Sequence, residues 1–540
     1  MSKAFVSALF LLLCQTAELH ALKILIFTPA ISSSQVTFNN RIATLLSDAG
    51  HEVALYFAEY APEIVHEPKN TKARIIAAPS KPAAAPATDI GNRFAESGFK
   101  GSPSMLSAEH RALVRDFAQM FMDGCETQVQ NKDLLNELKA EQFDIAFAHM
   151  YDLCPFGLIH MLEIPTTIWM SSGVLTEVIA LQTGVPSPTS FVPGTMSDFS
   201  DHMTFTQRAA NTIGSTLFTP FFLHLMDGQT EIFRRNVDKK FPSLLDLASN
   251  KTQLVFINSV ELLDFPRPIL HKIVFIGGIG MQEPKPLDEA WEAMANSAED
   301  GVILISFGSV APSTQMPVHW KRAIVELARR MPKFEFVWKY ESDDLKSGKI
   351  VGDLPGNLHL SNWVPQTDLL GHPQLKAFIT HGGYNSLMES AYAGTPILAV
   401  PLFGDQYRNA QCSVRHGFGQ VVDKTNFGVH ELQRGLNTLL NDPSFTENAQ
   451  RLARMLRKRP TKSEDLVVRW TEFVAEFQTL PNLDAASRGM SAVVYHNFDV
   501  WALFAATLIV ALYIAYRALR LICQWCCGAS KTKQGRPKTE

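Results

Sequence analysis

The chain has 540 residues, of which 46% are hydrophobic and 19% are charged, and its formal net charge is −4. A chain of this length and composition can bury more than one core, so we expect at least two domains and exclude a disordered or fibrous protein. Residues 517–540 carry a net charge of +5, which leaves about −9 for the rest. This balance excludes nucleic acids and other polyanions as partners of the main body.

The first 21 residues have the layout of a secretory signal peptide. A basic Lys3 precedes the apolar run 4–14, and small and polar residues follow. This segment is too short to span a membrane and is normally removed after export. We therefore expect the mature protein to begin near residue 22.

The positions of the seven cysteines predict no disulfide framework. Four lie in the signal segment or near the carboxyl terminus, and the other three are Cys125, Cys154 and Cys412. Their number and spacing indicate neither a disulfide scaffold nor a metal site.

Alternating strand and helix patterns open the mature chain. Residues 22–27 form an apolar run typical of a buried strand, residues 38–49 have the spacing of an amphipathic helix, and residues 53–57 predict a second strand. This order predicts a doubly wound α/β domain. The Ala-, Pro- and Ser-rich stretch 61–104 predicts a surface loop. Further elements are expected at 108–140 (helical), 143–148 (strand) and 164–170 (strand).

A second α/β domain is expected to follow a boundary near residues 263–285. Pro266-Arg267-Pro268 and Gly277-Gly278 interrupt the chain there, and strands and helices then alternate to about residue 440. The stretch 301–309 predicts an apolar strand that ends in Phe-Gly-Ser, where the Ser309 hydroxyl can bind a phosphate.

The most informative segment is 363–411. Within it, residues 375–379 predict a buried strand, Thr380-His381-Gly382-Gly383 a tight turn, and the apolar spacing from Leu387 to Tyr392 a helix. Two glycines let the backbone approach a ligand closely, and the unpaired N–H groups at a helix start favour an anion. The segment therefore predicts a site for a diphosphate.

Polar residues around this turn suit the other parts of a sugar nucleotide. The imidazole of His381 can donate to a phosphate oxygen, and Asn385 and Ser386 add donors in the first helical turn. Glu389, one turn further on, can accept from ribose hydroxyls. Upstream, the indole of Trp363 can stack on a base and the amide of Gln366 can pair with its edge.

Asp405 and Gln406 follow another predicted strand, residues 397–400, and Pro401. Both side chains therefore emerge at the carboxyl end of a strand, where ligands bind in open α/β sheets. Each residue type alone is more often structural: a core Trp, a satisfied His or a plain Gly-Gly turn. The joint order and spacing favour a binding site.

Segment 363–411 resembles the donor-binding signature of the UDP-glycosyltransferases, in particular the membrane-anchored UDP-glucuronosyltransferases. Residues 184–208 and 462–498 also resemble this family, so the similarity covers nearly the whole mature chain. The resemblance implies an α/β fold of GT-B type, with two Rossmann-like domains facing across a cleft, plus one C-terminal transmembrane helix. It implies inverting transfer of glucuronosyl or glucosyl from a UDP-sugar to a small lipophilic acceptor, with no metal or cofactor.

The resemblance also implies residue roles. Trp363 and Gln366 would hold uracil and ribose, and Asp405 and Gln406 the sugar hydroxyls. The complete implied donor site is Ser309, Trp363, Gln366, His381, Gly383, Asn385, Ser386, Glu389, Asp405 and Gln406. The implied division of the chain is signal peptide 1–21, acceptor-binding domain 22–265, UDP-sugar-binding domain 266–460, closing helices 461–499, transmembrane helix 500–522 and basic cytosolic tail 523–540.

Three residues depart from the family pattern. Gln35 in Ser34-Gln35-Val36 replaces the histidine that serves as general base, and an amide cannot accept a proton near neutrality. His149 replaces the acidic partner after strand 143–148. An imidazole, with an ordinary pKa of ~6.5, can accept a proton there, oriented by Asp152 or Asp144. A purely structural His149 is the alternative.

The third departure is Ile257, where vertebrate glucuronosyltransferases tend to carry Arg. Arg can pair with the carboxylate of glucuronate and Ile cannot, so UDP-glucose is an alternative to UDP-glucuronate as the donor.

The carboxyl-terminal region predicts a single-pass anchor. Residues 500–516 carry no charge and reach the lower limit for a spanning helix, and the basic residues beyond them predict a cytosolic tail. The body is then luminal, Asn250-Lys251-Thr252 is an acceptor for N-glycosylation, and family likeness places the protein in the endoplasmic reticulum membrane.

Two other functions fit parts of the sequence. A non-catalytic UDP-sugar-binding partner subunit would explain Gln35. A nicotinamide dehydrogenase would share the Rossmann-like domains, but Gly277-Gly278-Ile279-Gly280 lacks the spacing of G-x-G-x-x-G. The sequence leaves the acceptor open, and also whether the protein is a homo- or hetero-oligomer.

Overall fold

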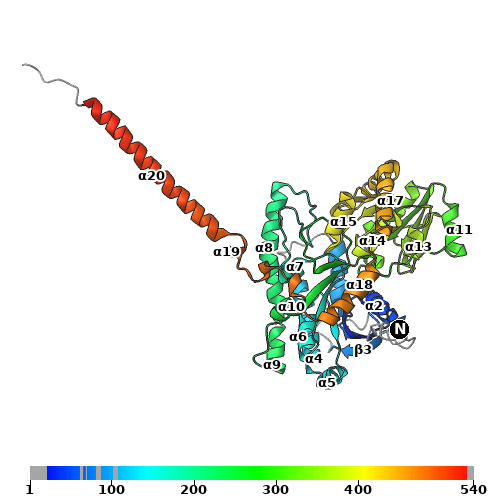
Figure 1. The fold of residues 1–540 in the computed structure, drawn as a ribbon. Coiled ribbons are helices and arrows are strands. Elements are labelled where there is room, and N and C mark those ends of the chain that lie inside the picture. The colour runs from blue at the N-terminus through cyan, green and yellow to red at the C-terminus, as the bar shows by residue number, and fades with distance from the viewer. Residues whose placement is uncertain (1–20, 61–64, 69, 81–86, 101–107, 532–540) are drawn as a thin grey trace, which may run out of the picture. The chain divides into compact units, whose positions relative to one another are not determined.

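The computed structural model describes residues 21–60, 65–68, 70–80, 87–100 and 108–531. The predicted signal peptide thus lies almost entirely outside the described residues, as does the end of the basic tail. Two compact units are present, residues 1–484 and 485–540. The first contains both sheets (Figure 1).

The first sheet has seven parallel strands in the order β3-β2-β1-β4-β5-β6-β7. Their bounds are β1 Lys23–Pro29, β2 Glu52–Glu59, β3 Arg74–Pro79, β4 Ile145–Ala148, β5 Thr167–Ser171, β6 Thr252–Ile257 and β7 Ile273–Phe275. The helices among them are α2 Ser33–Asp48, α3 Ala87–Phe99, α4 Ala108–Gln130, α5 Lys132–Glu141, α6 Cys154–Met161, α7 Glu177–Thr183, α8 Phe205–Asp227, α9 Thr230–Asn236 and α10 Leu244–Lys251.

The second sheet has six parallel strands in the order β10-β9-β8-β11-β12-β13. Their bounds are β8 Gly301–Ser306, β9 Phe334–Lys339, β10 Leu358–Ser361, β11 Leu375–Thr380, β12 Ile397–Ala399 and β13 Gly419–Val421. Its helices are α11 Glu289–Ser297, α12 Val318–Arg330, α13 Gln366–Leu370, α14 Tyr384–Ala393, α15 Gln406–Arg415, α16 Val429–Asn441 and α17 Pro443–Arg457.

Both sheets are covered on two faces, which is why their strands are apolar runs without alternation. In β1, Leu25 packs into one core with α4, α5 and α6, and the neighbouring Ile26 packs on the opposite face with α2. In β8, Ile305 packs with α12 and α16, and Leu304 with α14 and α17. The predicted fold class, two Rossmann-like domains, is confirmed.

The prediction of an unstructured surface loop over residues 61–104 is wrong. This stretch contains strand β3 at the edge of the first sheet, and helix α3. The physical reason is tertiary: Phe99 of α3 is buried edge-on against Trp320 of the second domain, with ring centroids 5.5 Å apart. A Cβ at Gly98 would lie 2.8 Å from the Phe403 ring, so α3 needs a glycine to pack this closely.

After α17 the chain returns to the first domain. Helix α18, Ser463–Phe477, buries Val467 and Val474 in the core formed by α2 and one face of the first sheet. Residues 485–540 contain the short helix α19, Ala492–Tyr495, and the long helix α20, Phe498–Lys531. The segment Phe498–Cys526 of α20 has a mean hydropathy of 2.1 and is long enough to cross a membrane.

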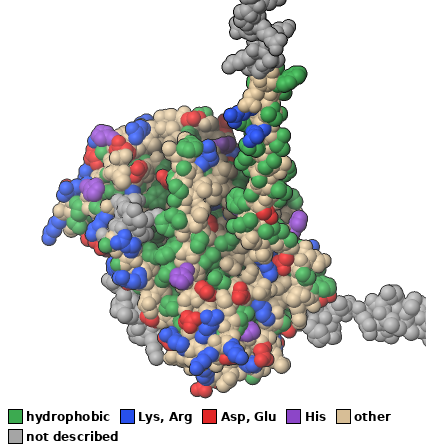
Figure 2. Space-filling view, turned by 90° about the vertical axis from the view of Figure 1, so that its left-hand side faces the viewer, with side chains coloured by type: hydrophobic (Ala, Val, Ile, Leu, Met, Phe, Trp, Pro, Cys, Tyr) green, Lys and Arg blue, Asp and Glu red, His purple; other side chains and the backbone are tan. Residues whose placement is uncertain are grey.

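Helix α8 has an exposed apolar face. Figure 2 shows hydrophobic side chains along this side of the molecule. The exposed large residues of α8 are Phe205, Ile213, Leu217, Phe218 and Phe221. Surface residues of this kind in a row favour contact with an apolar partner or with lipid.

Candidate active site

The predicted strand, glycine turn and helix occur where the sequence places them. Strand β11 ends at Thr380, and α14 begins at Tyr384 with Gly383 as its N-cap. Gly382 between them has φ = +79°, a left-handed conformation that favours glycine. The turn therefore presents the amino end of α14 at the carboxyl edge of the second sheet.

The imidazole of His381 lies between two glycines. A Cβ at Gly308 would be 2.7 Å from its Cε1 atom, and a Cβ at Gly383 would be 2.5 Å from its Nε2 atom. Gly308 and Ser309 follow β8, which pairs with β11. Strand pairing thus brings the loop of Ser309 next to His381, as the anion-site interpretation requires.

The charge at this turn comes from Lys339, which the sequence analysis missed. Lys339 is the last residue of β9, and its Nζ atom donates to the carbonyl oxygen of Gly308 at 3.1 Å. Burial, and then the charge of Lys339, lower the pKa of His381 to about 4. His381 is therefore neutral at neutral pH, and Lys339 supplies the positive charge. Its position at the end of an apolar run is visible in the sequence, but its place beside β8 depends on strand order.

Three further predicted residues meet on α13 and α14. The Gln366 amide donates to the Glu389 carboxylate and lies 3.5 Å from the Ser386 hydroxyl. Burial raises the pKa of Glu389, although Gln366 and the charge of Arg41 oppose that shift. Trp363 is 69% exposed, so one face of its indole is free to stack on a ligand.

A cavity of about 900 Å³ lies beside these residues. Trp363, Gln366 and Glu389 line one side, and Thr37 and Arg41 of α2 line the other. The cavity is therefore built from both domains. Arg41 is a second residue that the sequence analysis missed, because its contact with this site depends on how the domains pack.

Asp405 and Gln406 lie at the start of α15, after the loop that follows β12. The Gln406 Oε1 atom accepts from the backbone N–H groups of Leu402 and Phe403, at 2.8 and 3.1 Å, which fixes this loop. The Asp405 Oδ2 atom accepts from Asn409 Nδ2 at 2.8 Å, and the same nitrogen donates to the carbonyl oxygen of Gly382 at 3.2 Å. The loop and the glycine turn are thus joined.

Tyr151 of the first domain is close to Asp405. Burial, and in part the charge of Asp405, raise the pKa of Tyr151 to about 12, and its hydroxyl lies 3.3 Å from the Ser172 hydroxyl. Tyr151 also ends a series of neighbouring aromatic rings. The series is Phe403–Phe94–Phe117–Phe121–Tyr151, with successive centroid distances of 6.4, 5.6, 5.1 and 6.3 Å. Aromatic side chains thus extend from the second domain through α3 and α4 to the residue beside Asp405.

The structure brings His149 and Asp152 together. His149 Nε2 lies 3.6 Å from Asp152 Oδ1, and His149 Nδ1 accepts from the backbone N–H of Tyr151 at 3.3 Å. This assigns the lone pair to Nδ1 and the hydrogen to Nε2, which faces the carboxylate. Burial lowers the pKa of His149 to about 3 and raises that of Asp152 to about 7.

The other candidates for this group lie apart from it. Asp144 precedes β4, at the end of the strand opposite His149, and accepts from the backbone N–H of Lys23 at 2.7 Å. It cannot orient His149, so that alternative is wrong. Gln35 lies in the first turn of α2, after the neighbouring strand β1, and no contact in the described part of the chain joins it to His149 or Asp152. Ile257, the last residue of β6, is completely buried.

A disulfide bond joins Cys125 of α4 to Cys154 at the start of α6. The cysteine positions predict no disulfide framework, and this single bond was missed because the two helices become neighbours only in the folded domain. Cys154 lies two residues after Asp152, so the bond fixes one end of the loop that carries the His149–Asp152 pair. Disulfides of this kind are typical of proteins in oxidising compartments.

Two facing α/β domains, with ligand-sized space between them, are the architecture of GT-B glycosyltransferases. The fold is similar to the glycosyltransferase of kitacinnamycin, with 18% identity, a TM-score of 0.55 and coverage of 85% of this chain and 99% of that one. It is also similar to spinosyn rhamnosyltransferase SpnG complexed with thymidine diphosphate, with 17% identity, a TM-score of 0.52 and coverage of 83% and 100%.

The profile of the UDP-glucoronosyl and UDP-glucosyl transferase family matches residues 23–533. Human UDP-glucuronosyltransferase 1A6 is 30% identical over 501 residues, 92% of this chain and 90% of that protein. Rat UDP-glucuronosyltransferase 1-2 is 31% identical over 421 residues, 78% of this chain and 77% of that protein. The chain therefore belongs to the UDP-glucoronosyl and UDP-glucosyl transferase family, and it is an enzyme of UDP-sugar glycosyl transfer.

Proposed function

We propose that the enzyme transfers glucose from UDP-glucose to a hydroxyl group of a small lipophilic acceptor, with inversion, at the luminal side of the endoplasmic reticulum membrane. One observation carries the proposal. Gln366 of α13 meets Ser386 and Glu389 of α14, the helix that starts at the His381 turn, beside a cavity of about 900 Å³.

In this proposal the second domain binds the donor. Trp363 stacks on uracil, and Gln366 and Glu389 bind its edge and the ribose hydroxyls. The diphosphate lies at the amino end of α14 within reach of Gly383, Asn385, Ser386, Ser309 and His381. Lys339 stabilises the negative charge that develops on UDP as it leaves.

The chemistry near Asp405 favours an uncharged hexose over glucuronate. Asp405 and Gln406 offer a carboxylate and an amide to sugar hydroxyls. Ile257 provides no cation for a sugar carboxylate, and the guanidinium of Arg408, near Asp405, is already paired with Asp264 at 2.6 Å. A carboxylate on the sugar would therefore find no partner in Ile257 or Arg408, and burying an unpaired charge is costly.

The His149–Asp152 pair would act as the base. The acceptor oxygen attacks the anomeric carbon from the face opposite UDP, the bond from that carbon to the phosphate oxygen breaks, and UDP leaves with the electron pair. For the proton to pass, the Tyr151 N–H must leave His149 Nδ1 and the 3.6 Å separation between Nε2 and Asp152 Oδ1 must shorten. The acceptor proton then goes to Nδ1 while the Nε2 proton moves to Asp152, which has the higher proton affinity. Gln35 can hydrogen-bond the acceptor hydroxyl but cannot deprotonate it.

The surroundings of the pair support a lipophilic acceptor. Phe94, Phe117 and Tyr151 are partly exposed members of the aromatic series, and aromatic faces bind flat apolar molecules well. The apolar span of α20 and the exposed face of α8 support a membrane location, from which such acceptors partition. The Cys125–Cys154 bond supports a luminal body, and the basic residues that follow the apolar span support a cytosolic tail.

The test combines binding with turnover on the full-length protein. Calorimetry should detect UDP binding, and His381→Ala should weaken it by about tenfold or more, because a hydrogen bond to a charged group is lost. With a simple phenol as acceptor, UDP-glucose should be used faster than UDP-glucuronate or UDP-galactose. UDP binding without transfer or donor hydrolysis would instead identify a non-catalytic partner subunit.

A further inference from the structure

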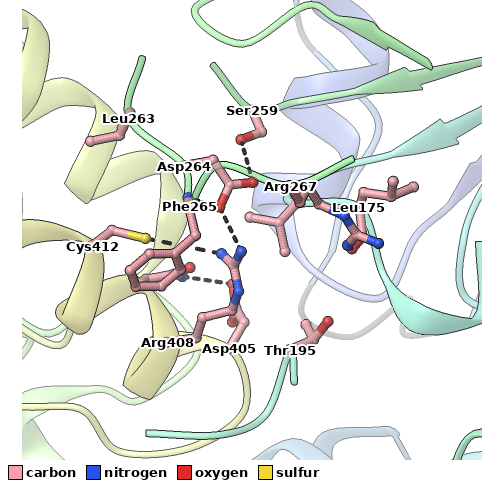
Figure 3. A network of polar contacts seen from close by, with 12 residues as sticks. Leu175, Thr195, Ser259, Leu263, Asp264, Phe265, Arg267, Asp405, Arg408 and Cys412 are labelled. Atoms are coloured by element: carbon pink, nitrogen blue, oxygen red, sulfur yellow. Dashed lines mark hydrogen bonds and ion pairs between the residues drawn. The ribbon is translucent and has the colours of Figure 1, made fainter. Parts of the chain in front are cut away.

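A buried ion pair connects the two domains beside the donor site (Figure 3). The Arg408 Nη2 atom of α15 lies 2.6 Å from Asp264 Oδ1, in the segment that follows β6, and the two side chains are only 3% and 6% exposed. The ring of Phe265 packs on the guanidinium, with its centroid 5.0 Å from Arg408 Cζ.

This pair is maintained at a cost. Burial opposes a charge on Arg408, but the Asp264 carboxylate, with smaller contributions from Cys412 and Tyr384, favours it, so that the pKa of Arg408 lies above its usual value. A buried ion pair contributes little net stability compared with apolar packing, yet breaking it leaves one charge unpaired. The value of such a pair therefore lies in fixing one arrangement of the elements it joins.

The elements joined here carry the sugar-binding side chains. Asp405 precedes Arg408 by three residues on the first turn of α15, and Asn409 ties Asp405 to the carbonyl oxygen of Gly382. The other Asp264 oxygen, Oδ2, accepts from the Ser259 hydroxyl at 3.2 Å, and that hydroxyl lies 2.7 Å from Tyr384 OH, on the first residue of α14. The segment after β6 thus contacts the first turns of both donor-site helices.

We propose that Asp264 and Arg408 are positioning residues for the donor sugar. Acting through α15, they fix the positions of Asp405 and Gln406 so that both side chains can bind the hexose hydroxyls. Asp264 and Arg408 themselves contact neither the UDP-sugar nor the acceptor. This inference rests on the proposed function, which assigns Asp405 and Gln406 to the sugar.

Loss of the ion pair should affect the binding of UDP-glucose and of UDP differently. The nucleoside is held by Trp363, Gln366 and Glu389, none of which contacts Arg408. The His381 turn meets α15 through Asn409 and the Asp264 segment through Ser259 and Tyr384, and both Arg408→Gln and Asp264→Asn keep these hydrogen-bonding groups. Loosening α15 should therefore weaken binding of the hexose and leave the UDP contacts in place. A residue that merely stabilises the fold would affect both ligands equally.

The experiment measures the Kd for UDP and the KM for UDP-glucose on full-length variants. Arg408→Gln and Asp264→Asn should each raise KM for UDP-glucose by about tenfold or more, the loss expected when charge-assisted hydrogen bonds are misplaced. The Kd for UDP should change by less than about twofold, since no UDP contact is removed. If Arg408→Gln does not fold, Arg408→Lys, which keeps the charge but lacks the planar fork, should show the same split at smaller size.

A second ion pair of the segment after β6, Glu261 with Arg459, provides a matched control. Arg459 makes a two-pronged pair with Glu261, at 3.3 and 3.0 Å, and its side chain is 6% exposed, but it leads to the stretch after α17 and not to α15. Arg459→Gln should lower the Tm and leave the ratio of UDP-glucose to UDP affinity unchanged.

Asp405→Ala serves as the reference. The positioning proposal is overturned if Asp405→Ala raises KM for UDP-glucose without changing the Kd for UDP and the Arg408 variants do not. It is also overturned if Arg459→Gln raises KM for UDP-glucose in the same selective way. If Asp405→Ala itself shows no split, the assignment of the sugar site fails, and if wild-type protein does not bind UDP, the proposed function fails.

Discussion

His149 and Asp152 show how one buried site can separate two proton affinities. Both side chains are almost inaccessible to solvent, and burial disfavours the charged form of each. The imidazole therefore becomes a weak base, while the carboxyl group holds its proton up to about pH 7. In the proposed mechanism the carboxylate is the final proton acceptor, and the imidazole transmits the proton to it.

This arrangement predicts a pH dependence. In the proposed mechanism the pair accepts a proton only when Asp152 is ionised, so kcat/KM should rise with pH up to about 7 and then level off, in line with the raised pKa of Asp152. Asp152→Asn should lower kcat by about 100-fold or more, the usual contribution of a general base. It should also remove the inflection near pH 7.

Asp144→Asn is the matched control, since Asp144 lies at the opposite end of the same strand. Its pH profile should equal that of the wild type. An unchanged inflection in Asp152→Asn would show that another group accepts the proton.

Local chain geometry alone brings together a first group of the residues found from the sequence. His381, Gly383 and Glu389 belong to one strand-turn-helix unit, whose spacing is visible in the sequence. Lys339 ends β9 and Tyr151 lies in the loop after β4, and their neighbours depend on strand order and on domain packing. Sequence spacing carries no record of either, which is why both were missed.

At the scale of elements, long-range packing determines secondary structure that local composition does not predict. The stretch 61–104 is rich in residues that disfavour regular structure, yet residues 87–99 form a helix because the second domain buries one face of it. The strands and helices that were predicted correctly are those whose own apolar pattern is strong.

The disulfide bond makes a testable contribution at this scale. Cys125 and Cys154 close a loop with a sequence separation of 29, so the double variant Cys125→Ala/Cys154→Ala should lose about 3 kcal/mol of unfolding free energy. Urea unfolding of the body, monitored by fluorescence, measures the loss. A reductant should destabilise the wild type and leave the double variant unaffected. Alkylation of both thiols in unreduced wild-type protein would contradict the assignment.

At the scale of the whole molecule, the order of strands and helices was enough to predict two doubly wound domains. The return of α18 to the first domain follows from its apolar face, which fills the core beside α2. The packing between the domains could not be derived from the sequence, since it depends on complementary surfaces and not on periodic patterns.

The proposed topology has its own test. Asn250 is exposed at the end of α10, and a luminal body would expose its acceptor sequence to the glycosylation machinery. Expression in cultured animal cells should give a product that becomes smaller after endoglycosidase treatment and that stays with carbonate-washed membranes. The Asn250→Gln variant should have the lower mass from the start, and endoglycosidase should not change it. Protease added to sealed microsomes should remove only the tail. Digestion of the body would reverse the orientation.

The packing of α3 has a practical consequence for exchanging specificities between relatives. This helix comes from the amino-terminal half of the chain but completes the apolar core of the other half. In a chimera joined near residue 265, α3 from one parent would therefore pack against Trp320 from the other parent. A hybrid should fold better when residues 87–100 are taken from the same parent as the donor half, even though more than 150 residues of the other parent then separate them.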